Sequence, residues 1–391
     1  MHVPTLALYL ATITTALAWT PAPTNETDLL AAEGLRKVAQ LYAFGNITSQ
    51  KYGNCSLASA TVRKEWTSLE PQERKAYTDA VLCLQSKPSR LDPAIVPGAK
   101  NRYDDFVALH INQTLSIHVT ASFLSWHRLF TWNYEKALQD ECGYQGTQPY
   151  WNWGKARYTA FDPLGSPVFD GSDFSMSGNG IYDPHNCTDA LPSHLNCIPA
   201  GSGGGCVQTG PFKNMTVNLG PVAPALRIAG LNASSSKFAY NPRCLRRDVS
   251  VWVSSNWTRD IDSSDLIKQN LDIDSFQSVM QGFGTAPGYY GVHSGGHFTI
   301  GGDPGGDFYA SPGDPAFFLH HAQIDRTWTI WQNQDFTARR NVISGTITLA
   351  NSPPSRNGTL DDILDMGTTG QSVTMRDAMS TLDGPFCYIY A

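Results

Sequence analysis

The chain carries, from residue 314 to residue 328, the sequence Asp314-Pro315-Ala316-Phe317-Phe318-Leu319-His320-His321-Ala322-Gln323-Ile324-Asp325-Arg326-Thr327-Trp328. This apolar, aromatic-rich run predicts a buried helix that extends to residue 332. A similar run upstream, Phe123-Leu124-Ser125-Trp126-His127-Arg128, lies in a helix predicted over residues 122–140. When the two runs are aligned, His127 corresponds to His321. The sequence therefore uses one histidine-bearing helix pattern twice.

Six of the ten histidines fall into two triplets, which are His110, His118 and His127, and His293, His297 and His321. His293 and His297 have the i, i+4 spacing that places two side chains on one face of a helix, although Gly295 and Gly296 between them weaken the helix prediction. Neutral imidazole binds copper, zinc, iron or nickel. Two triplets without a cysteine or a nearby acidic ligand favour a pair of copper ions over a structural zinc ion.

These histidines also have possible roles other than metal binding. A single histidine is more often an interior residue than a ligand, so the prediction depends on both triplets together. His320 competes with His321 for the ligand position, and the correspondence between His127 and His321 favours His321, with His320 beside it. A further candidate, a zinc knuckle, would use His185, His194, Cys187 and Cys197. In an oxidising compartment these cysteines are expected to form disulfides instead.

The composition indicates a globular protein without a polyanionic partner. The 391 residues are 41% hydrophobic and 16% charged, with a net charge of −6, so we expect neither nucleic acid nor an anionic membrane surface as a partner. The apolar run from Leu6 to Leu17, followed by Ala18, is typical of a signal peptide, so residues 1–18 are expected to be removed and residues 19–391 to form a single domain. Beyond residue 18 no apolar run approaches the ~18 residues needed to span a membrane.

The cysteines and glycosylation sequons predict a secreted protein. The eight cysteines are expected to form disulfides, whose pairing the sequence leaves open, as it does the oligomeric state. N-glycans are predicted at some of nine sequons, which begin at Asn25, Asn46, Asn54, Asn112, Asn186, Asn214, Asn232, Asn256 and Asn357.

The remaining periodicity predicts a mainly α-helical fold with long loops and minor strands. Helices are predicted over residues 29–42, 61–69, 71–84, 101–112, 122–140, 246–259, 272–281 and 314–332, and minor strands over 342–349 and 373–375. The segment from 165 to 241 is rich in Gly, Pro, Ser and Asn and contains three cysteines. We expect it to be a long excursion held by disulfides rather than a domain boundary.

Taken together, these motifs resemble those of the binuclear (type 3) copper proteins, which include tyrosinases, catechol oxidases and molluscan-type haemocyanin units. The resemblance is strongest to short secreted ascomycete catechol oxidases, and Arg63-Lys64-Glu65-Trp66 and Tyr388-Ile389-Tyr390 extend it over residues 60 to 390. It implies a four-helix bundle that holds two copper ions through the six histidines. It also implies a catalytic domain that uses O2 to oxidise o-diphenols to o-quinones, with no shielding domain after Tyr390.

The resemblance also suggests roles for residues around the metals. Phe317 matches a phenylalanine that packs on a ligand imidazole, while Asp325 and Arg326 could tie the last helix to the bundle. Ser294 and Phe298 match positions that face the substrate. Plain core packing and exposed loop positions are the corresponding structural alternatives. Ser116 stands where many fungal members have a cysteine that forms a thioether to the second histidine, so that crosslink is excluded.

Two departures from tyrosinases predict selectivity for o-diphenols. Tyrosinases commonly have asparagine at the position of Ser294 and a nearby glutamate, which together hold a water that deprotonates monophenols, whereas this chain offers Gln281. We therefore expect catechol oxidation with slow monophenol hydroxylation. Full tyrosinase activity, haemocyanin-like oxygen binding and zinc hydrolysis are the alternatives, the last disfavoured because no carboxylate adjoins the His293/His297 pair.

Overall fold

The computed structural model describes residues 25–43, 55–155, 162–187, 197–226, 230–286 and 288–391. The predicted signal peptide, residues 1–18, lies outside the described residues, as do the sequons at Asn46 and Asn54. Within the described part of the chain, no helix is both long enough and apolar enough to cross a bilayer.

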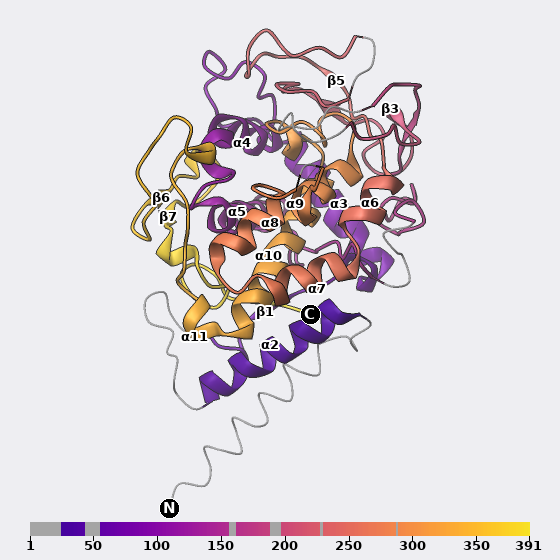
Figure 1. Cartoon of the computed structure of the whole chain (residues 1–391). Helices are drawn as coiled ribbons and strands as arrows, with labels where there is room; N and C mark the ends of the chain where they lie inside the picture. The colour runs from indigo at the N-terminus through magenta and orange to yellow at the C-terminus, as the bar shows by residue number, and fades with distance from the viewer. Residues whose placement is uncertain (1–24, 44–54, 156–161, 188–196, 227–229, 287) are drawn as a thin grey trace, which may run out of the picture.

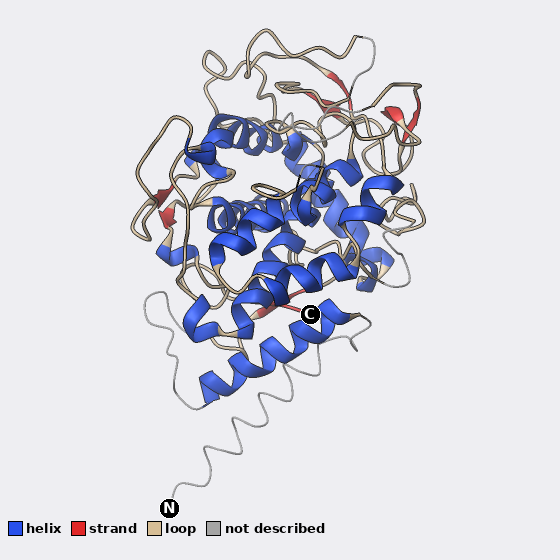
Figure 2. Cartoon of the chain, viewed as in Figure 1, coloured by secondary structure: helices blue, strands red, loops and turns tan. Residues whose placement is uncertain are grey.

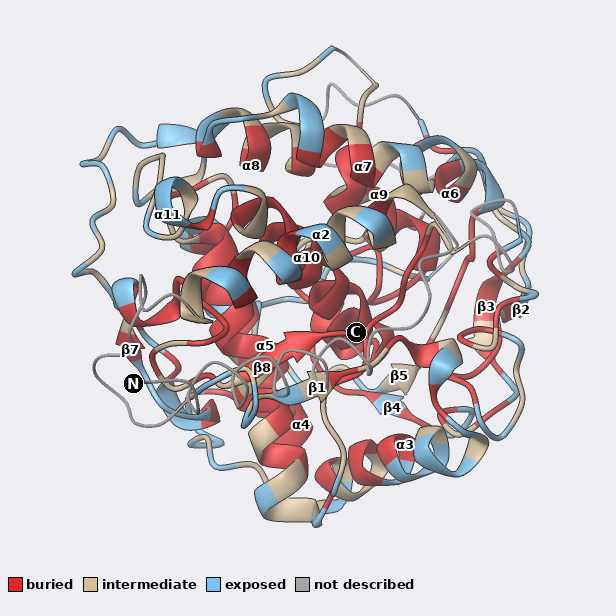
Figure 3. Ribbon diagram, turned by 90° about the horizontal axis from the view of Figure 1, so that it is seen from below, coloured by how far each residue is buried: buried red, intermediate tan, exposed pale blue. Residues whose placement is uncertain are grey.

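Four helices at the centre of the molecule carry the histidine triplets (Figure 1). They are α4 (Arg102–Ile117), α5 (Phe123–Cys142), α9 (Gly291–Ile300) and α10 (Ala316–Gln334). Helix α10 packs against both α5 and α9, and α4 packs against α5. Their residues are mostly buried, as Figure 3 shows for α10 and α5. The mainly α-helical fold predicted from the sequence is therefore confirmed.

Local sequence explains where α4 begins and where it ends. Asn101 precedes the helix, and its side-chain oxygen accepts a hydrogen bond from the backbone N–H of Asp104 at 3.0 Å, while the Asp104 carboxylate accepts one from the N–H of Asn101 at 3.2 Å. This reciprocal capping satisfies two donors that the first helical turn would otherwise leave unpaired. The helix continues past the predicted residue 112 and ends at Ile117, so His118 is its C-terminal capping residue.

Further helices surround these four. One predicted helix begins later than expected, and one helix was not predicted. The surrounding helices are α2 (Glu26–Ala43), α3 (Pro71–Ser86), α6 (Val251–Trp257), α7 (Asp260–Gln269), α8 (Ile273–Gln281) and α11 (Phe336–Arg339). The helix predicted over 246–259 begins only at Val251, because the preceding residues pair in extended conformation with neighbouring loops: Arg246 forms bridges with Cys206 and Asp303. Helix α7 was not predicted, because its sequence, from Asp260 to Gln269, is short and polar.

The strands are short (Figure 2), and the pair β1–β8 lies beside α5 in the middle of the molecule (Figure 3). Within the described residues they form four two-stranded sheets: β1 (Thr61–Arg63) with β8 (Tyr388–Tyr390), β2 (Gly180–Tyr182) with β3 (Gly204–Val207), β4 (Thr216–Val217) with β5 (Arg243–Cys244), and β6 (Ile363–Leu364) with β7 (Val373–Thr374). The prediction of a strand near 373–375 is confirmed by β7, but the one over 342–349 is wrong. The helix predicted over 61–69 is also wrong, since β1 pairs in parallel with the end of the chain and a 3-10 turn follows at Trp66–Ser68.

A buried carboxylate joins α10 to α5 and to β8. Asp325 accepts hydrogen bonds from the hydroxyls of Tyr388 and Tyr390, both at 2.6 Å, and from Nε of Arg128 at 2.6 Å. All four side chains are buried, and removing one partner of such a pair typically costs ~3–5 kcal/mol. Arg326 donates to Asp28 on α2 at 2.6 Å. The two residues therefore tie the last long helix to the elements around it.

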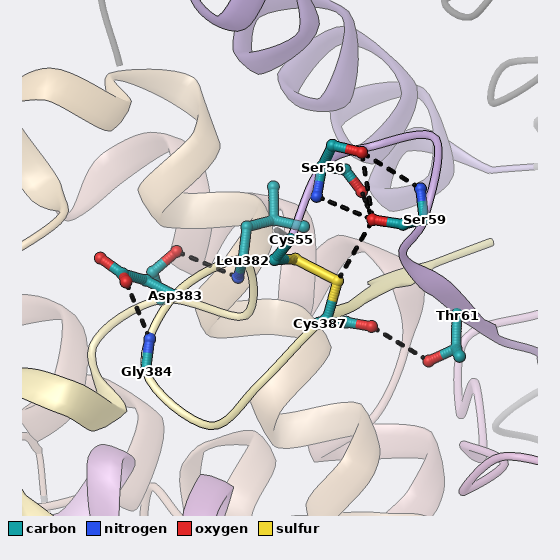
Figure 4. Close-up of a disulfide and its surroundings, with 9 residues drawn as sticks. Cys55, Ser56, Ser59, Thr61, Leu382, Asp383, Gly384 and Cys387 are labelled. Carbon is teal, nitrogen blue, oxygen red and sulfur yellow. Dashed lines mark hydrogen bonds between the residues drawn. A yellow bond between two sulfur atoms is a disulfide. The ribbon is translucent and has the colours of Figure 1, made fainter. Parts of the chain in front are cut away.

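All eight cysteines are paired, as Cys55–Cys387, Cys83–Cys142, Cys187–Cys197 and Cys206–Cys244. The Cys187–Cys197 disulfide leaves no thiolate for a zinc knuckle with His185. Cys55–Cys387 lies beside β1, where the hydroxyl of Thr61 donates to the carbonyl of Cys387 at 3.2 Å (Figure 4). This disulfide therefore fixes the same junction of the two ends of the chain that the β1–β8 pairing makes.

Candidate metal centre

The first histidine triplet converges between α4 and α5. His110 lies within α4, His118 caps its C-terminal end, and His127 lies one turn into α5. All three side chains are buried, and their candidate ligand nitrogens lie within 4.8 Å of one another. The short loop between the two helices turns back sharply and so brings His118 beside the histidines of both. Helix geometry thus creates a three-imidazole cluster from residues spread over the sequence.

Backbone carbonyls fix the orientation of these three rings. Nδ1 donates to the carbonyl of Tyr309 in His110 (2.7 Å), to that of Thr114 in His118 (3.0 Å), and to that of Phe123 in His127 (2.7 Å). A neutral ring that donates from Nδ1 has its lone pair on Nε2. Nε2 of His110 and of His127 is buried with no hydrogen-bond partner in the protein. These unpaired nitrogens fit a metal ion at the cluster.

The second cluster is formed by α9 and α10. It contains His293 and His297 from α9 together with His320 and His321 from α10, and their candidate ligand atoms also lie within 4.8 Å of one another. Nε2 of His297 lies 3.1 Å from Nε2 of His321, and Nε2 of His293 is buried without a hydrogen-bond partner. The cluster has the same donor chemistry as the first, and it contains no carboxylate.

The two neighbouring histidines on α10 occupy different surroundings. Phe317 stacks on His321, with ring centroids 4.1 Å apart and planes inclined by 27°. His320 instead packs over Gly296, where an added Cβ would lie only 2.2 Å from its Cε1 atom. His320 also lies within the cluster, with its ring centroid 4.6 Å from that of His297, and both of its ring nitrogens are buried without a hydrogen-bond partner in the protein.

The two glycines of α9 are explained by this close packing. An added Cβ at Gly295 would lie 2.7 Å from Cβ of Trp257, and one at Gly296 would meet the ring of His320. Glycine lowers helix propensity by roughly 1 kcal/mol relative to alanine. Tertiary contacts outweigh that cost here, because α9 is helical from Gly291 to Ile300 and places His293 and His297 on one face.

Burial keeps the clustered histidines in their neutral form. Desolvation lowers the pKa of His118 to about 4 and that of His297 to about 3, and it lowers the pKa of His110 and His127 well below the ordinary value. Neighbouring imidazoles add to this effect, because a second positive charge nearby disfavours protonation. At neutral pH the nitrogens therefore carry lone pairs and no proton must leave before a metal binds.

A cavity of about 840 Å³ opens onto both clusters. Its walls include His118 from the first cluster and His293 and His297 from the second. Three residues that the sequence predicted near the substrate, Ser294, Phe298 and Gln281, also line it. Phe317 does not line the cavity. It lies behind the rings of His110 and His321, where it packs the metal centre from inside the core.

The structure adds three residues that sequence reasoning missed. The ring of Phe308 lies against His118, with centroids 4.7 Å apart, and the carbonyl of Tyr309 holds His110. Asp307 is buried at the cavity wall. All three follow Pro304-Gly305-Gly306 in the segment between α9 and α10. The sequence does carry one signal that could have found them: between the two histidine-bearing helices, a pair of glycines is followed by an acidic residue and two aromatic residues.

Polar groups near Ser294 are engaged with one another. The Ser294 hydroxyl donates to the backbone carbonyl of Gln281 at 3.3 Å. The side chain of Gln281 accepts from the N–H of Val119 at 2.9 Å and donates to the carbonyl of Gln277 at 3.1 Å. Both ends of the Gln281 amide are therefore used within the protein. The amide connects α8 to the residue that follows His118.

The chain is similar, in sequence and in structure, to known proteins of one family. The model of the common central domain of tyrosinase matches residues 100–334. The chain is 40% identical over 345 residues to tyrosinase P of Aspergillus terreus, which spans 85% of this chain and 92% of the relative. It is 38% identical over 371 residues to the N-acetyl-6-hydroxytryptophan oxidase of Emericella nidulans, across 91% of this chain and 99% of that one. A polyphenol oxidase variant from Thermothelomyces thermophila superposes with a TM-score of 0.82 at 39% identity, covering 100% of this chain and 99% of the other.

Proposed function

The chain belongs to the tyrosinase family of copper oxidases that act on phenols, and from this premise we propose that it oxidises o-diphenols to o-quinones and hydroxylates monophenols only slowly. The two histidine clusters fit the family's pair of copper ions. We assign one ion to His110, His118 and His127, and the other to His293, His297 and His321. When bound, the copper pair supplies the redox chemistry that moves two electrons from the phenol to O2.

The protein's own contribution is a cavity that brings a phenol to both clusters. Because His118, His293 and His297 all border the cavity, a ring that enters it meets the ligands of both ions. Phe308 and Phe298 border the same space and offer aromatic faces for the substrate ring. The cavity volume lies within the ~300–1,000 Å³ typical of small-molecule sites, so it accommodates phenols with substituents larger than a hydrogen atom.

The observation that carries the o-diphenol preference is the lack of a free base at the cavity wall. Among the described lining residues, Asp307 is the one carboxylate, and its oxygens accept four backbone N–H bonds. Gln281 and Ser294 are engaged with the protein, as described above. A monophenol depends on a protein-held base to lose its proton. An o-diphenol carries a second hydroxyl that exchanges protons itself, so we expect it to be the better substrate.

Oxygen uptake on matched substrates tests this proposal. The purified, copper-loaded protein is given tyramine and dopamine, which differ only in the second hydroxyl. We expect rapid uptake with dopamine and slow or lag-dominated uptake with tyramine. Equal initial rates would show a true tyrosinase. Reversible oxygen binding without quinone formation would show an oxygen carrier instead.

We also propose that the protein is secreted and carries N-glycans. All eight cysteines are paired in disulfides, and such bonds persist in oxidising compartments. Expression from the full-length gene in a fungal host should place the protein in the culture medium with an N-terminus near residue 19. Digestion with an N-glycan-removing endoglycosidase should lower its mass. Retention in the cells with residues 1–18 intact would contradict the proposal.

A further inference from the structure

Asp307 has an unusual environment for a carboxylate. Its side chain is 1% exposed, and it receives four backbone hydrogen bonds from two separate segments. Oδ2 accepts from the N–H groups of Val222 (2.7 Å) and Ala223 (2.8 Å), and Oδ1 accepts from those of Tyr309 (2.8 Å) and Ala310 (3.0 Å). Burying a carboxylate is costly unless its oxygens are hydrogen-bonded. Each carboxylate oxygen of Asp307 accepts its two hydrogen bonds from a different segment of the chain.

One of these segments supports the first histidine cluster. Asp307 organises the turn that includes Phe308 and Tyr309. The carbonyl of Tyr309 accepts the Nδ1–H of His110 at 2.7 Å, which sets the tautomer of that ring, and Phe308 packs against His118. The turn therefore contacts two of the three histidines in the cluster. If the turn moved, the Nε2 lone pair of His110 would lose its fixed direction.

The other segment forms part of the cavity wall. Val222 and Ala223 lead directly into Pro224 and Ala225, and residues 223–225 all line the cavity. Ala225 packs with Phe298 of α9 in a small apolar cluster. The Asp307 carboxylate thus joins the wall to the base of the metal centre through two hydrogen bonds on each side.

We propose that Asp307 is a positioning residue. It fixes the cavity wall at residues 222–225 relative to the turn whose Tyr309 carbonyl orients His110. Its carboxylate acts through the four backbone N–H groups that it accepts from, two on each segment. Its loss should therefore weaken both substrate binding and copper retention at the first cluster, while the second cluster keeps its ion. The substrate-binding part of this inference rests on the proposed o-diphenol oxidase function, whereas the copper-retention part does not.

Asp307→Asn is the direct test, because the amide has the same shape and one oxygen. The oxygen can satisfy one pair of N–H groups, and the amide NH2 then faces the other pair. We expect KM for dopamine to rise about tenfold, with a smaller change in kcat, from the loss of two charge-assisted hydrogen bonds. Dialysis against a chelator should release one copper ion from the variant at a chelator concentration that leaves both in the wild-type protein.

Asp303→Asn provides the matched control. Asp303 lies in the same segment and is also 1% exposed, but its carboxylate accepts from Arg243, at 2.9 Å for Oδ1, and does not line the cavity. This variant should lose thermal stability and keep KM and both copper ions. The proposal is overturned if Asp307→Asn retains wild-type KM and copper, or if Asp303→Asn shows the same changes as Asp307→Asn.

Hydrogen exchange on the wild-type protein keeps the proposal testable if the Asn variant does not fold. Val222 and Ala223 are only half-buried, so their amides would exchange quickly without the carboxylate. We expect slow exchange in peptides that cover residues 221–226, and exchange at the rate of an exposed loop would overturn the proposal. If the wild-type protein does not oxidise dopamine, the proposed function fails, but copper release and hydrogen exchange still test Asp307.

Discussion

The imidazole rings of His127 and His321 stack on each other, with centroids 4.5 Å apart and planes inclined by 15°. They come from α5 and α10, the two helices whose sequences carry the same histidine pattern. The stacked rings form the boundary between the two clusters, so each cluster is built against a ligand candidate of the other. Because His321 rather than His320 stacks on His127, alanine variants of the two residues should differ in the copper that they bind.

His321→Ala should lose one copper ion and all turnover, because its ring faces His297 and borders both clusters. His320→Ala should keep two copper ions, since His320 packs over Gly296 and takes no part in the stack of His127 and His321. Copper per chain, measured by elemental analysis after gel filtration, distinguishes the variants. Loss of copper in the His320 variant with retention in the His321 variant would transfer the ligand assignment to His320.

Ser294→Asn should raise monophenol turnover relative to o-diphenol turnover. An asparagine at this position offers an amide that can help hold a water near the second cluster, and one well-placed hydrogen bond of ~1.4 kcal/mol corresponds to a tenfold change in rate. The measurement is the ratio of kcat/KM for tyramine to that for dopamine. Ser294→Ala removes the hydroxyl without adding an amide and should leave the ratio unchanged. An unchanged ratio in Ser294→Asn would assign selectivity to another cavity residue such as Phe298.

Gly296→Ala should destabilise the protein although alanine is the better helix former. The new Cβ would lie 2.2 Å from the ring of His320, and overpacking of this kind typically costs ~1–3 kcal/mol. The double variant Gly296→Ala with His320→Ala removes the clash and should recover part of the loss. Urea unfolding of the two single variants and the double variant measures the coupling. Purely additive effects would contradict the packing described here.

Acid should destabilise the metal-free protein. Burial lowers the pKa of His118 to about 4, whereas a histidine in an unfolded chain has a pKa of about 6.5. Below pH ~6.5 His118 binds a proton in the unfolded chain but not in the folded chain. Its contribution to the free energy of unfolding is therefore complete only above that pH. It falls by ~1.4 kcal/mol per pH unit for each such histidine until the pH reaches about 4. Unfolding midpoints across this range should show a shallower decline in His118→Gln, and equal slopes would count against it.

The helices of the metal centre could be predicted because their signals are local. Periodic apolar residues mark α4, α5 and α10, and the repeated histidine pattern relates His127 to His321 without any structure. The structure brings all six predicted histidines into two clusters. His320 could not be separated from His321 by periodicity, since consecutive residues on a helix differ by a rotation whose consequence depends on what packs against each.

The parts that sequence reasoning missed depend on distant partners. Thr61–Arg63 is a strand only because it pairs with Tyr388–Tyr390 at the other end of the chain, which outweighs any local helix preference. Asp307 gains its importance from Val222 and Ala223, which contact it across more than 80 residues of sequence. The disulfide pairing is non-local in the same sense, because eight cysteines allow 105 arrangements.

The Cys55–Cys387 disulfide spans 332 residues of sequence, and it determines how the protein behaves after a protease has cut it. A single cut in any exposed loop between these cysteines would produce two pieces that remain one covalent molecule. Helical packing would hold the halves in place, and the disulfide would prevent their diffusing apart even if the packing opened. A nicked molecule would therefore migrate as intact protein on a gel until a reducing agent is added.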